Sequence, residues 1–425
     1  MPVMRPSLML KKTLFRTILF HGGFMMHCTR KITDQLYYVG QSDRRLALFE
    51  NVYRLDDGMA YNSYLLLDDK TVLFDCVDHA VERQFLENVE YVLGDRKLDY
   101  LVVHHMEPDH SETIAALLEE YPDVTLVGTA KAHGLLRQFF DFKKEPAFIE
   151  VKENDTLDTG HHKLSFVMAP MVHWPEVMVT YDATSHILFS ADAFGTFGAL
   201  SGNIFADEFE YEHRMLDEAR RYYINIVGKY GMQVQMLLKK ASALDISMIC
   251  PLHGPIWREN LGYIIDKYNT WSSYASELDS VLIVYGSIYG NTENAAQVLS
   301  MKLAERGVKN MGLYDVSKTD IATLVSEAFK YKTIVFASSS LNAGLFLNME
   351  NLLLDLKAHF FQNRNVALIQ NGSWAPSAMR CMTEIIGSMK NINLIEHKVD
   401  IRSSLKEDQL SDLDQLADSL AATVK

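Results

Sequence analysis

A six-residue segment holds the densest group of potential metal ligands in the first half of the chain. It reads His105-Met106-Glu107-Pro108-Asp109-His110 and follows an apolar run over 98–103 that predicts a buried strand. In extended backbone His105 and Glu107 project to the same side, and Pro108 disfavours helix before it, so Asp109 can turn toward a neighbouring ion. The plain alternative is a polar loop that caps the following helix.

Three later residues supply distant partners, and each lies at the end of an expected strand. They are His173, Asp192 and His253. Taken singly each is weak, because a histidine beside apolar residues is more often structural and an aspartate after a strand usually caps a helix. Their joint occurrence with the 105–110 segment, in this order, favours one shared metal site.

The ligand types narrow the choice of metal. Three imidazoles and three carboxylates without a thiolate favour first-row metals that accept nitrogen and oxygen together. Iron fits, manganese is compatible and zinc remains open. One carboxylate, best Asp192, can bridge two ions about 3.5–4 Å apart.

A second chemical signal lies in the other half, where the segment 286–292 joins an expected strand, 281–285, to a helix, 293–305. Glycines there let the backbone approach a ligand, Ser287, Asn291 and Thr292 add donors, and the helix start favours a phosphate. No GxGxxG or GKS/T motif is present, so neither a dinucleotide nor a nucleoside triphosphate is indicated. An ordinary capped turn is the plain alternative for this segment alone.

Two later strand ends strengthen the ligand hypothesis. The segments 337–344 and 370–376 each follow an expected strand and are rich in serine, asparagine and glycine. In a doubly wound sheet such loops share one edge beside the switch point where ligands bind. Their amides and hydroxyls can bond a planar ring system, with Trp374 stacked near it.

The elements that must position these residues alternate between strand and helix. Polar, small residues over 272–280 suggest a linker. We therefore expect a non-structural extension over 1–25, a metal-binding domain over 26–275 and a second domain over 280–425, with an open parallel sheet in the last.

Composition excludes several classes of protein. The chain has 425 residues, 48% of them hydrophobic, and a net charge of −14, which makes it a poor binder of nucleic acid. No apolar run reaches about 18 residues, so we expect no membrane span. Four widely spaced cysteines without a CxxC pair argue against disulfides and favour the cytoplasm.

With these motifs in order, the chain resembles the flavodiiron proteins, also called A-type flavoproteins, over about 26–425. The first half resembles their metallo-β-lactamase-like αββα sandwich, whose hydrolase motif HxHxDH is here His105-x-Glu107-x-Asp109-His110. The second half resembles a flavodoxin-like doubly wound parallel sheet. Segments 192–200, DAFGTFGAL, and 253–258, HGPIWR, are also similar to the family's.

The resemblance implies a role for each candidate residue of the first half. One iron would take His105, Glu107, His173 and Asp192, and the other would take Asp109, His253 and the same Asp192. His110, Trp174 and Phe194 would lie around the pocket without binding metal, and a plain packing role weighs more for them.

For the second half the resemblance implies bound FMN. The expected contacts are Ser287, Ile288, Tyr289, Gly290, Asn291, Thr292, Ser338, Ser339, Ser340, Leu341, Asn342, Gly344, Asn371, Gly372, Ser373 and Trp374. Ser338 and Ser339 depart from the family's more usual Ser-Pro-Thr run.

The implied activity is reduction of O₂ to water, of NO to N₂O, or of both, at a non-haem diiron site fed by FMN. The resemblance further implies a head-to-tail homodimer or a homotetramer. The donor would be a separate protein, rubredoxin or a flavin reductase, because no CxxC pairs remain for a fused rubredoxin. Two alternatives remain: a zinc hydrolase fused to a flavodoxin-like domain, and a pure electron carrier that has lost its metals.

Overall fold

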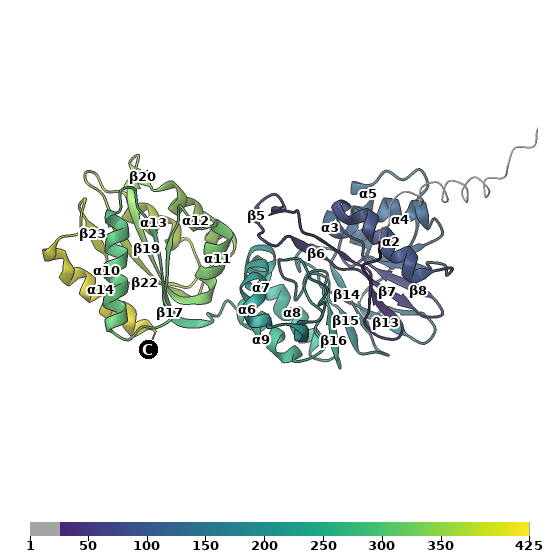
Figure 1. The fold of residues 1–425 in the computed structure, drawn as a ribbon. Helices are drawn as coiled ribbons and strands as arrows, with labels where there is room; N and C mark the ends of the chain where they lie inside the picture. The colour runs from purple at the N-terminus through teal and green to yellow at the C-terminus, as the bar shows by residue number, and fades with distance from the viewer. Residues whose placement is uncertain (1–25, 425) are drawn as a thin grey trace, which may run out of the picture.

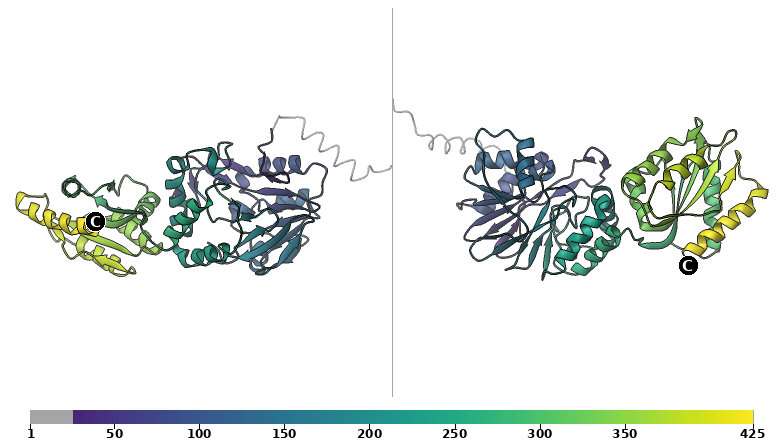
Figure 2. Two further views of the ribbon diagram at one scale, coloured as in Figure 1. Left: turned by 90° about the horizontal axis from the view of Figure 1, so that it is seen from below. Right: turned by 180° about the vertical axis from the view of Figure 1, so that it is seen from behind.

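The computed structural model describes residues 26–424, and their elements gather around three main sheets (Figure 1). The expected extension over 1–25 lies outside the described residues. Two of the sheets belong to the first half of the chain and the third to the second half. Two additional views show the halves side by side along the long axis of the molecule (Figure 2).

The first sheet is mixed, and its order is β1-β2-β7-β8-β9-β10-β11. Its strands β8 to β11 run parallel to one another, and β1, β2 and β7 add antiparallel pairs. The strands are β1 (Arg30–Lys31), β2 (Leu36–Tyr38), β7 (Tyr64–Leu67), β8 (Thr71–Phe74), β9 (Tyr100–Val102), β10 (Thr125–Gly128) and β11 (Ala147–Glu150).

The second sheet has the order β12-β13-β14-β15-β16 and is antiparallel except for its last pair. Two short hairpins, β3–β6 and β4–β5, complete the strands of this half. Their bounds are β12 (Thr156–Asp158), β13 (Lys163–Met168), β14 (Met178–Asp182), β15 (Ile187–Phe189), β16 (Met248–Cys250), β3 (Gln41–Asp43), β4 (Leu48–Phe49), β5 (Tyr53–Arg54) and β6 (Met59–Tyr61).

Apolar side chains fill the space between these two sheets. Phe74 of β8 stacks on Phe189 of β15 with ring centroids 3.8 Å apart, and both are buried among strand residues of both sheets. Helices pack on the outer faces (Figure 1). This is the αββα sandwich expected from the sequence.

The helices of the first half begin and end close to polar or glycine signals, such as the Thr129 hydroxyl that accepts from the Ala132 amide at the start of α5. Their bounds are η1 (His79–Val81), α2 (Glu82–Leu93), α3 (Pro108–Ser111), α4 (Ile114–Glu120), α5 (Ala130–Phe139), η2 (Ala206–Glu208), α6 (Tyr211–Arg214), α7 (Leu216–Tyr222), the π-helix η3 (Tyr223–Val227), η4 (Gly228–Tyr230), α8 (Gly231–Ala241) and α9 (Leu261–Ser272).

The third sheet has the order β18-β17-β19-β21-β22, which is the strand order of flavodoxin-like folds. Helices cover both faces (Figure 1). The elements are β17 (Leu278–Gly286), α10 (Asn291–Glu305), β18 (Gly312–Asp315), α11 (Ile321–Lys330), β19 (Tyr331–Leu341), β20 (Gly344–Leu345), α12 (Leu347–Ala358), β21 (Arg364–Asn371), α13 (Ala378–Gly387), β22 (Ile392–Leu394), β23 (Val399–Ile401), η5 (Glu407–Gln409) and α14 (Leu410–Thr423).

Polar contacts join the two halves beside the segment 273–277, which connects α9 to β17. The ring of His359, after α12, donates from Nε2 to the Asn225 carbonyl on the π-helix at 3.1 Å, and the Asn225 amide donates to the Ala322 carbonyl at 3.1 Å. Glu277 lies in this connecting segment, and its carboxylate accepts a hydrogen bond from Arg220 of α7. Within residues 26–424, no helix combines the length and apolar composition needed to span a bilayer.

Candidate diiron and flavin sites

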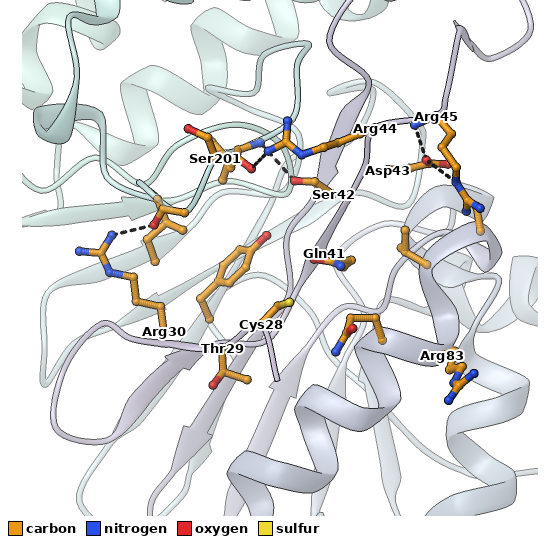
Figure 3. Close-up of a pocket in the computed structure, with 17 residues that line it drawn as sticks. Cys28, Thr29, Arg30, Gln41, Ser42, Asp43, Arg44, Arg45, Arg83 and Ser201 are labelled. Carbon is orange, nitrogen blue, oxygen red and sulfur yellow. Dashed lines mark hydrogen bonds and ion pairs between the residues drawn. The ribbon is translucent and has the colours of Figure 1, made fainter. Parts of the chain in front are cut away.

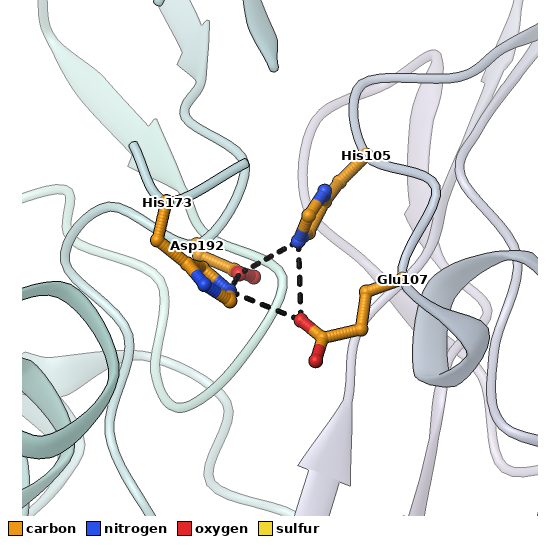
Figure 4. A group of neighbouring side chains, drawn as sticks. All are labelled: His105, Glu107, His173 and Asp192. Atoms are coloured by element: carbon orange, nitrogen blue, oxygen red, sulfur yellow. Dashed lines mark hydrogen bonds and ion pairs between the residues drawn. The ribbon is translucent and has the colours of Figure 1, made fainter. Parts of the chain in front are cut away.

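The six predicted metal ligands converge at one end of the sandwich. His105, Glu107, His173 and Asp192 form a first buried group, in which one ligand atom from each lies within 4.8 Å of the others (Figure 4). Asp109 and His253 form a second group together with His110. The side chains come from segments that are up to about 150 residues apart, since the first is at 105 and the last at 253.

Strand ends position every one of these side chains. The 105–110 segment follows β9, His173 lies between β13 and β14, Asp192 follows β15, and His253 follows β16. Glu107 keeps an extended backbone as the residue before α3, and Pro108 opens that helix, as the sequence pattern predicts. Ser111 ends α3, and its hydroxyl donates to the Met106 carbonyl at 2.9 Å.

Asp192 divides its two carboxylate oxygens between the groups. Oδ2 is 3.4 Å from His105 Nε2 and 3.2 Å from His173 Nε2, whereas Oδ1 is 3.1 Å from His110 Nε2 and 3.7 Å from His253 Nε2. This is the arrangement that a carboxylate needs to bridge two cations. The Nε2 atom of each imidazole faces the centre.

The donor atoms fit metal ions better than they fit one another. Both oxygens of Asp109, both oxygens of Asp192 and both ring nitrogens of His110 are buried without a hydrogen-bond partner among residues 26–424. Buried groups of this kind are costly unless they are paired or coordinate a metal. A pair of iron ions, with mixed nitrogen and oxygen ligands, would satisfy these atoms.

The pKa values in the metal-free site follow from burial and mutual charge. Burial raises the pKa of Asp109 to about 7. Burial alone would lower the pKa of His173, but its close contacts with the Asp192 and Glu107 carboxylates outweigh the burial and raise that pKa to about 9. The pKa of Asp192 is held well below its usual range, because neighbouring histidines outweigh its own burial. Metal ions would compete with these protons.

His110, which the sequence analysis placed around the pocket without binding metal, lies beside Asp109 and His253 in the second group, with Nε2 3.4 Å from Asp109 Oδ2. Trp174 packs edge-on against the His105 ring at 5.3 Å. Phe194 is buried against Tyr268 at 4.6 Å, which matches the packing alternative for it.

Three residues near the centre had not been predicted. Glu176 Oε1 is 2.8 Å from His105 Nδ1, and only its place shortly after His173 gave a sequence signal. Glu50, in the turn between β4 and β5, is exposed at the surface, but loss of solvent around its carboxyl group and the nearby charge of Glu107 raise the pKa of Glu50 to about 8. Tyr222 is buried with its ring 5.5 Å from that of His253. Neither Glu50 nor Tyr222 belongs to a local motif.

The predicted flavin loops line one cavity of about 350 Å³ at the edge of the third sheet. The lining contains no charged side chain, so a phosphate there would depend on hydroxyls, amides and the start of α10, where Gly290 leaves the first amides without a side-chain cap. Tyr289 and Trp374 are 92% and 82% exposed, which is unusual for large aromatic rings and fits rings that would cover a planar ligand. The cavity therefore suits FMN.

Most of the predicted flavin contacts line this cavity, and a few do not. Ser338 is fully buried and its hydroxyl donates to the Ser339 carbonyl, so its role here is structural. Gly290, Leu341 and Gly344 also fall outside the lining. Ser403, which the sequence did not single out, lines the cavity because its hydroxyl bonds that of Ser373 at 2.8 Å.

A larger cavity, of about 980 Å³, lies beside the β3–β6 hairpin and contains none of the predicted site residues (Figure 3). Four arginines line it, but three of them face carboxylates, which removes most of the apparent positive charge. The pairs are Arg30 with Glu208, Arg45 with Asp43 and Arg83 with Glu87, while Arg44 donates to the Leu200 carbonyl.

Comparison with known proteins agrees with both halves. The family described as ODP family beta lactamase matches residues 59–254, and the family described as Flavodoxin matches residues 283–396. An anaerobic nitric oxide reductase flavorubredoxin of Vibrio vulnificus is 30% identical over 358 residues, which are 83% of this chain and 71% of that protein.

Solved structures extend the likeness over nearly the whole chain. The rubredoxin oxygen:oxidoreductase of Desulfovibrio gigas is 26% identical with a TM-score of 0.87, covering 93% of this chain and 98% of that one. The flavodiiron protein of Giardia intestinalis, at 24% identity and the same TM-score, covers 95% and 98% and shares the fold. From the converging metal ligands, the flavin cavity and these relatives together, we conclude that the chain belongs to the flavodiiron proteins.

Proposed function

We propose that the protein reduces O₂ to water, NO to N₂O, or both, with electrons relayed by FMN to a diiron centre. The observation that carries the proposal is the division of the Asp192 oxygens between two buried groups of imidazoles and carboxylates. Relatives are named for each substrate: nitric oxide in flavorubredoxin and oxygen in the Desulfovibrio gigas protein. The zinc hydrolase alternative has no support among these relatives.

We assign the first metal position to His105, Glu107 and His173 and the second to Asp109 and His253, with Asp192 shared between them. We add His110 as a candidate ligand of the second position, because its Nε2 is 3.1 Å from Asp192 Oδ1. Iron there would transfer electrons to a small oxidant, and FMN would accept electrons and release them singly.

The remaining side chains keep this chemistry dry and oriented. Trp174 and Tyr222 pack against the rings of His105 and His253 and restrict their rotation. The carbonyl of Ala60 accepts from His253 Nδ1 at 2.8 Å, which directs the Nε2 lone pair to the second position. Glu50 lies where a carboxyl group can hold a proton beside Glu107.

Electron supply requires a route between the two halves. We propose that residues 26–275 and 280–425 act as separate metal and flavin domains. A head-to-tail homodimer, alone or within a homotetramer, would place the FMN of one subunit beside the iron of the other, in an isologous C₂ pair. We propose rubredoxin or a flavin reductase as the donor, and the relatives' names support the first of these. We propose the cytoplasm as the compartment, since all four cysteines are free.

The test is steady-state consumption of each gas by the iron-loaded, FMN-loaded protein with one reduced donor. We expect catalytic loss of at least one gas and two irons per chain by metal analysis. An Asp192→Asn variant should lose turnover while it keeps FMN. Consumption of neither gas by protein with two irons would refute the proposal, and two zinc ions with hydrolytic activity would favour the alternative.

A further inference from the structure

The histidines at the two metal positions are supported differently at their far nitrogens. His105 Nδ1 lies 2.8 Å from a carboxylate oxygen, Glu176 Oε1. His253 Nδ1 lies 2.8 Å from a neutral backbone carbonyl, that of Ala60. In both rings Nε2 points to the metal position, so each Nδ1 carries the proton and donates it. The two positions therefore differ in the charge of the group that accepts a hydrogen bond from the ligating histidine.

Glu176 is built into the protein so that its charge acts on this ring. Its side chain is fully buried, and Oε1 accepts a second hydrogen bond from the Met106 amide at 2.9 Å. The Thr129 hydroxyl donates to the Glu176 carbonyl at 3.0 Å and fixes the backbone. Oε2 has no hydrogen-bond partner among residues 26–424. Few other donors therefore neutralise the carboxylate, and much of its negative charge acts on His105.

We propose that Glu176 is a positioning residue that makes the two irons unequal in redox potential, an inference that rests on the diiron function above. A carboxylate behind a ligating imidazole raises the basicity of that ligand. A more basic ligand stabilises the higher oxidation state of the iron it holds. In a half-reduced centre, Fe(III) therefore occupies the position of His105 and His173, and the first electron goes to the iron of Asp109 and His253.

The test is a redox titration of the iron-loaded protein with dithionite, in which the electron paramagnetic resonance signal of the half-reduced centre measures its population. Glu176→Gln keeps an acceptor for His105 but removes the charge. We expect the comproportionation constant to fall at least tenfold, which is a narrowing of the gap between the two potentials by about 59 mV. The upper of the two potentials should stay near its original value.

A matched control is provided by His104, the histidine that directly precedes His105 in the sequence. Asp75 is an equally buried carboxylate that accepts from Nδ1 of His104, and the other nitrogen of that ring meets the Thr180 hydroxyl at 2.7 Å, so His104 holds no metal. Asp75→Asn should change the comproportionation constant by less than threefold. An equal effect of both variants would show that charge acts through space alone and would overturn the proposal.

A second variant decides the case in which Glu176→Gln loses iron. Glu176→Asp keeps the charge, so a variant that retains iron and shows a gap between the two potentials close to the original supports the proposal. Iron loss from both variants would assign Glu176 a structural role and would overturn the proposal. An unchanged gap in Glu176→Gln also overturns it. The titration needs no turnover, so a protein that consumes neither gas but shows the narrowed gap would refute the proposed function and leave this inference standing.

Discussion

Binding of metal to the iron-free protein should release protons in a number that depends on pH. Before any metal binds, His173 is charged near pH 8, because contacts with neighbouring carboxylates outweigh its burial and raise its pKa to about 9. The same cause raises the pKa of His105 well above its usual range. A metal ion needs the neutral imidazole, so the proton of His173 must leave. Asp109, with a pKa of about 7, is ionised at pH 8 and contributes no proton there.

The number of released protons should rise as the pH falls below 7. Burial raises the pKa of Asp109 above its unfolded value, so the protonated carboxyl is the stable form of the folded apoprotein in more acidic solution. Loading both positions should therefore release about one proton more near pH 6 than near pH 8. Each proton weakens the apparent binding of metal by about 1.4 kcal/mol for every unit of pH lost.

Calorimetric titration with Fe(II) under anaerobic conditions, in buffers with different ionisation enthalpies, measures these protons directly. Below pH 7 the protons of His173 and Asp109 should together lower the apparent binding constant for the pair of ions by at least about two decades per unit of pH. In Asp109→Asn the additional proton should be missing at the lower pH. A proton number near zero at pH 8, or one that does not rise toward pH 6, would refute the assignment of these side chains as ligands.

Four further predictions test other parts of the structure. Glu277→Ala removes the carboxylate beside the buried Arg220 and should lower the free energy of unfolding in denaturant by about 3 kcal/mol. Removal of Glu384 from the exposed Arg380–Glu384 ion pair is the control and should change it by less than about 1 kcal/mol. Gly290 has a φ of +90°, so Gly290→Ala should strain the cofactor loop by about 1 kcal/mol. The affinity for FMN, measured by fluorescence titration, should fall roughly fivefold. Gly262→Ala inside helix α9 is the control and should leave that affinity unchanged. The pKa of His359 is raised because hydrogen bonds to Asp355 and the Asn225 carbonyl outweigh its burial. The stabilisation of the folded protein by charged His359 is therefore full below the unfolded pKa of about 6.5 and is lost as the pH rises through the folded pKa. Limited proteolysis of the connecting segment 273–277 should be faster at pH 8.5 than at pH 6, and His359→Gln should abolish the difference. Gly195→Ala would place a Cβ 2.9 Å from Tyr222, so it should lower iron occupancy by metal analysis without changing FMN content, and equal loss of both would contradict this local effect.

The local pattern of the sequence predicted the elements that carry the site. The apolar run before His105, the proline at 108 and the strand ends before Asp192 and His253 all reflect backbone periodicity, which nearby residues determine. Boundaries were less accurate. Helix α9 continues to Ser272, into the region expected to be linker, and β17 begins at Leu278. Among the helices between β15 and β16 lies a π-helix, Tyr223–Val227, whose Asn225 contacts the second half.

Residues that act through contact across the fold escaped sequence analysis. Glu50 reaches Glu107 from a hairpin 57 positions earlier, a separation given by the two residue numbers, and Tyr222 meets His253 from a helix whose aromatic residues look like ordinary core. Neither carries a motif, because their distance from the metal position depends on how the sheets and helices pack. For His110 the sequence predicts a place beside the ligands, and the orientation of its ring decides whether it is a neighbour or a ligand.

The sequence alone determined the kinds of ligands, their chain order and the strand ends that present them, because residue chemistry and strand periodicity are local properties. The tertiary structure decided which oxygen of Asp192 faces which group, which histidine is supported by Glu176, and which flavin residues reach the cavity. Those relations depend on distances of a few ångströms between segments far apart in the chain. Only the packing of two sheets and their helices brings such segments together.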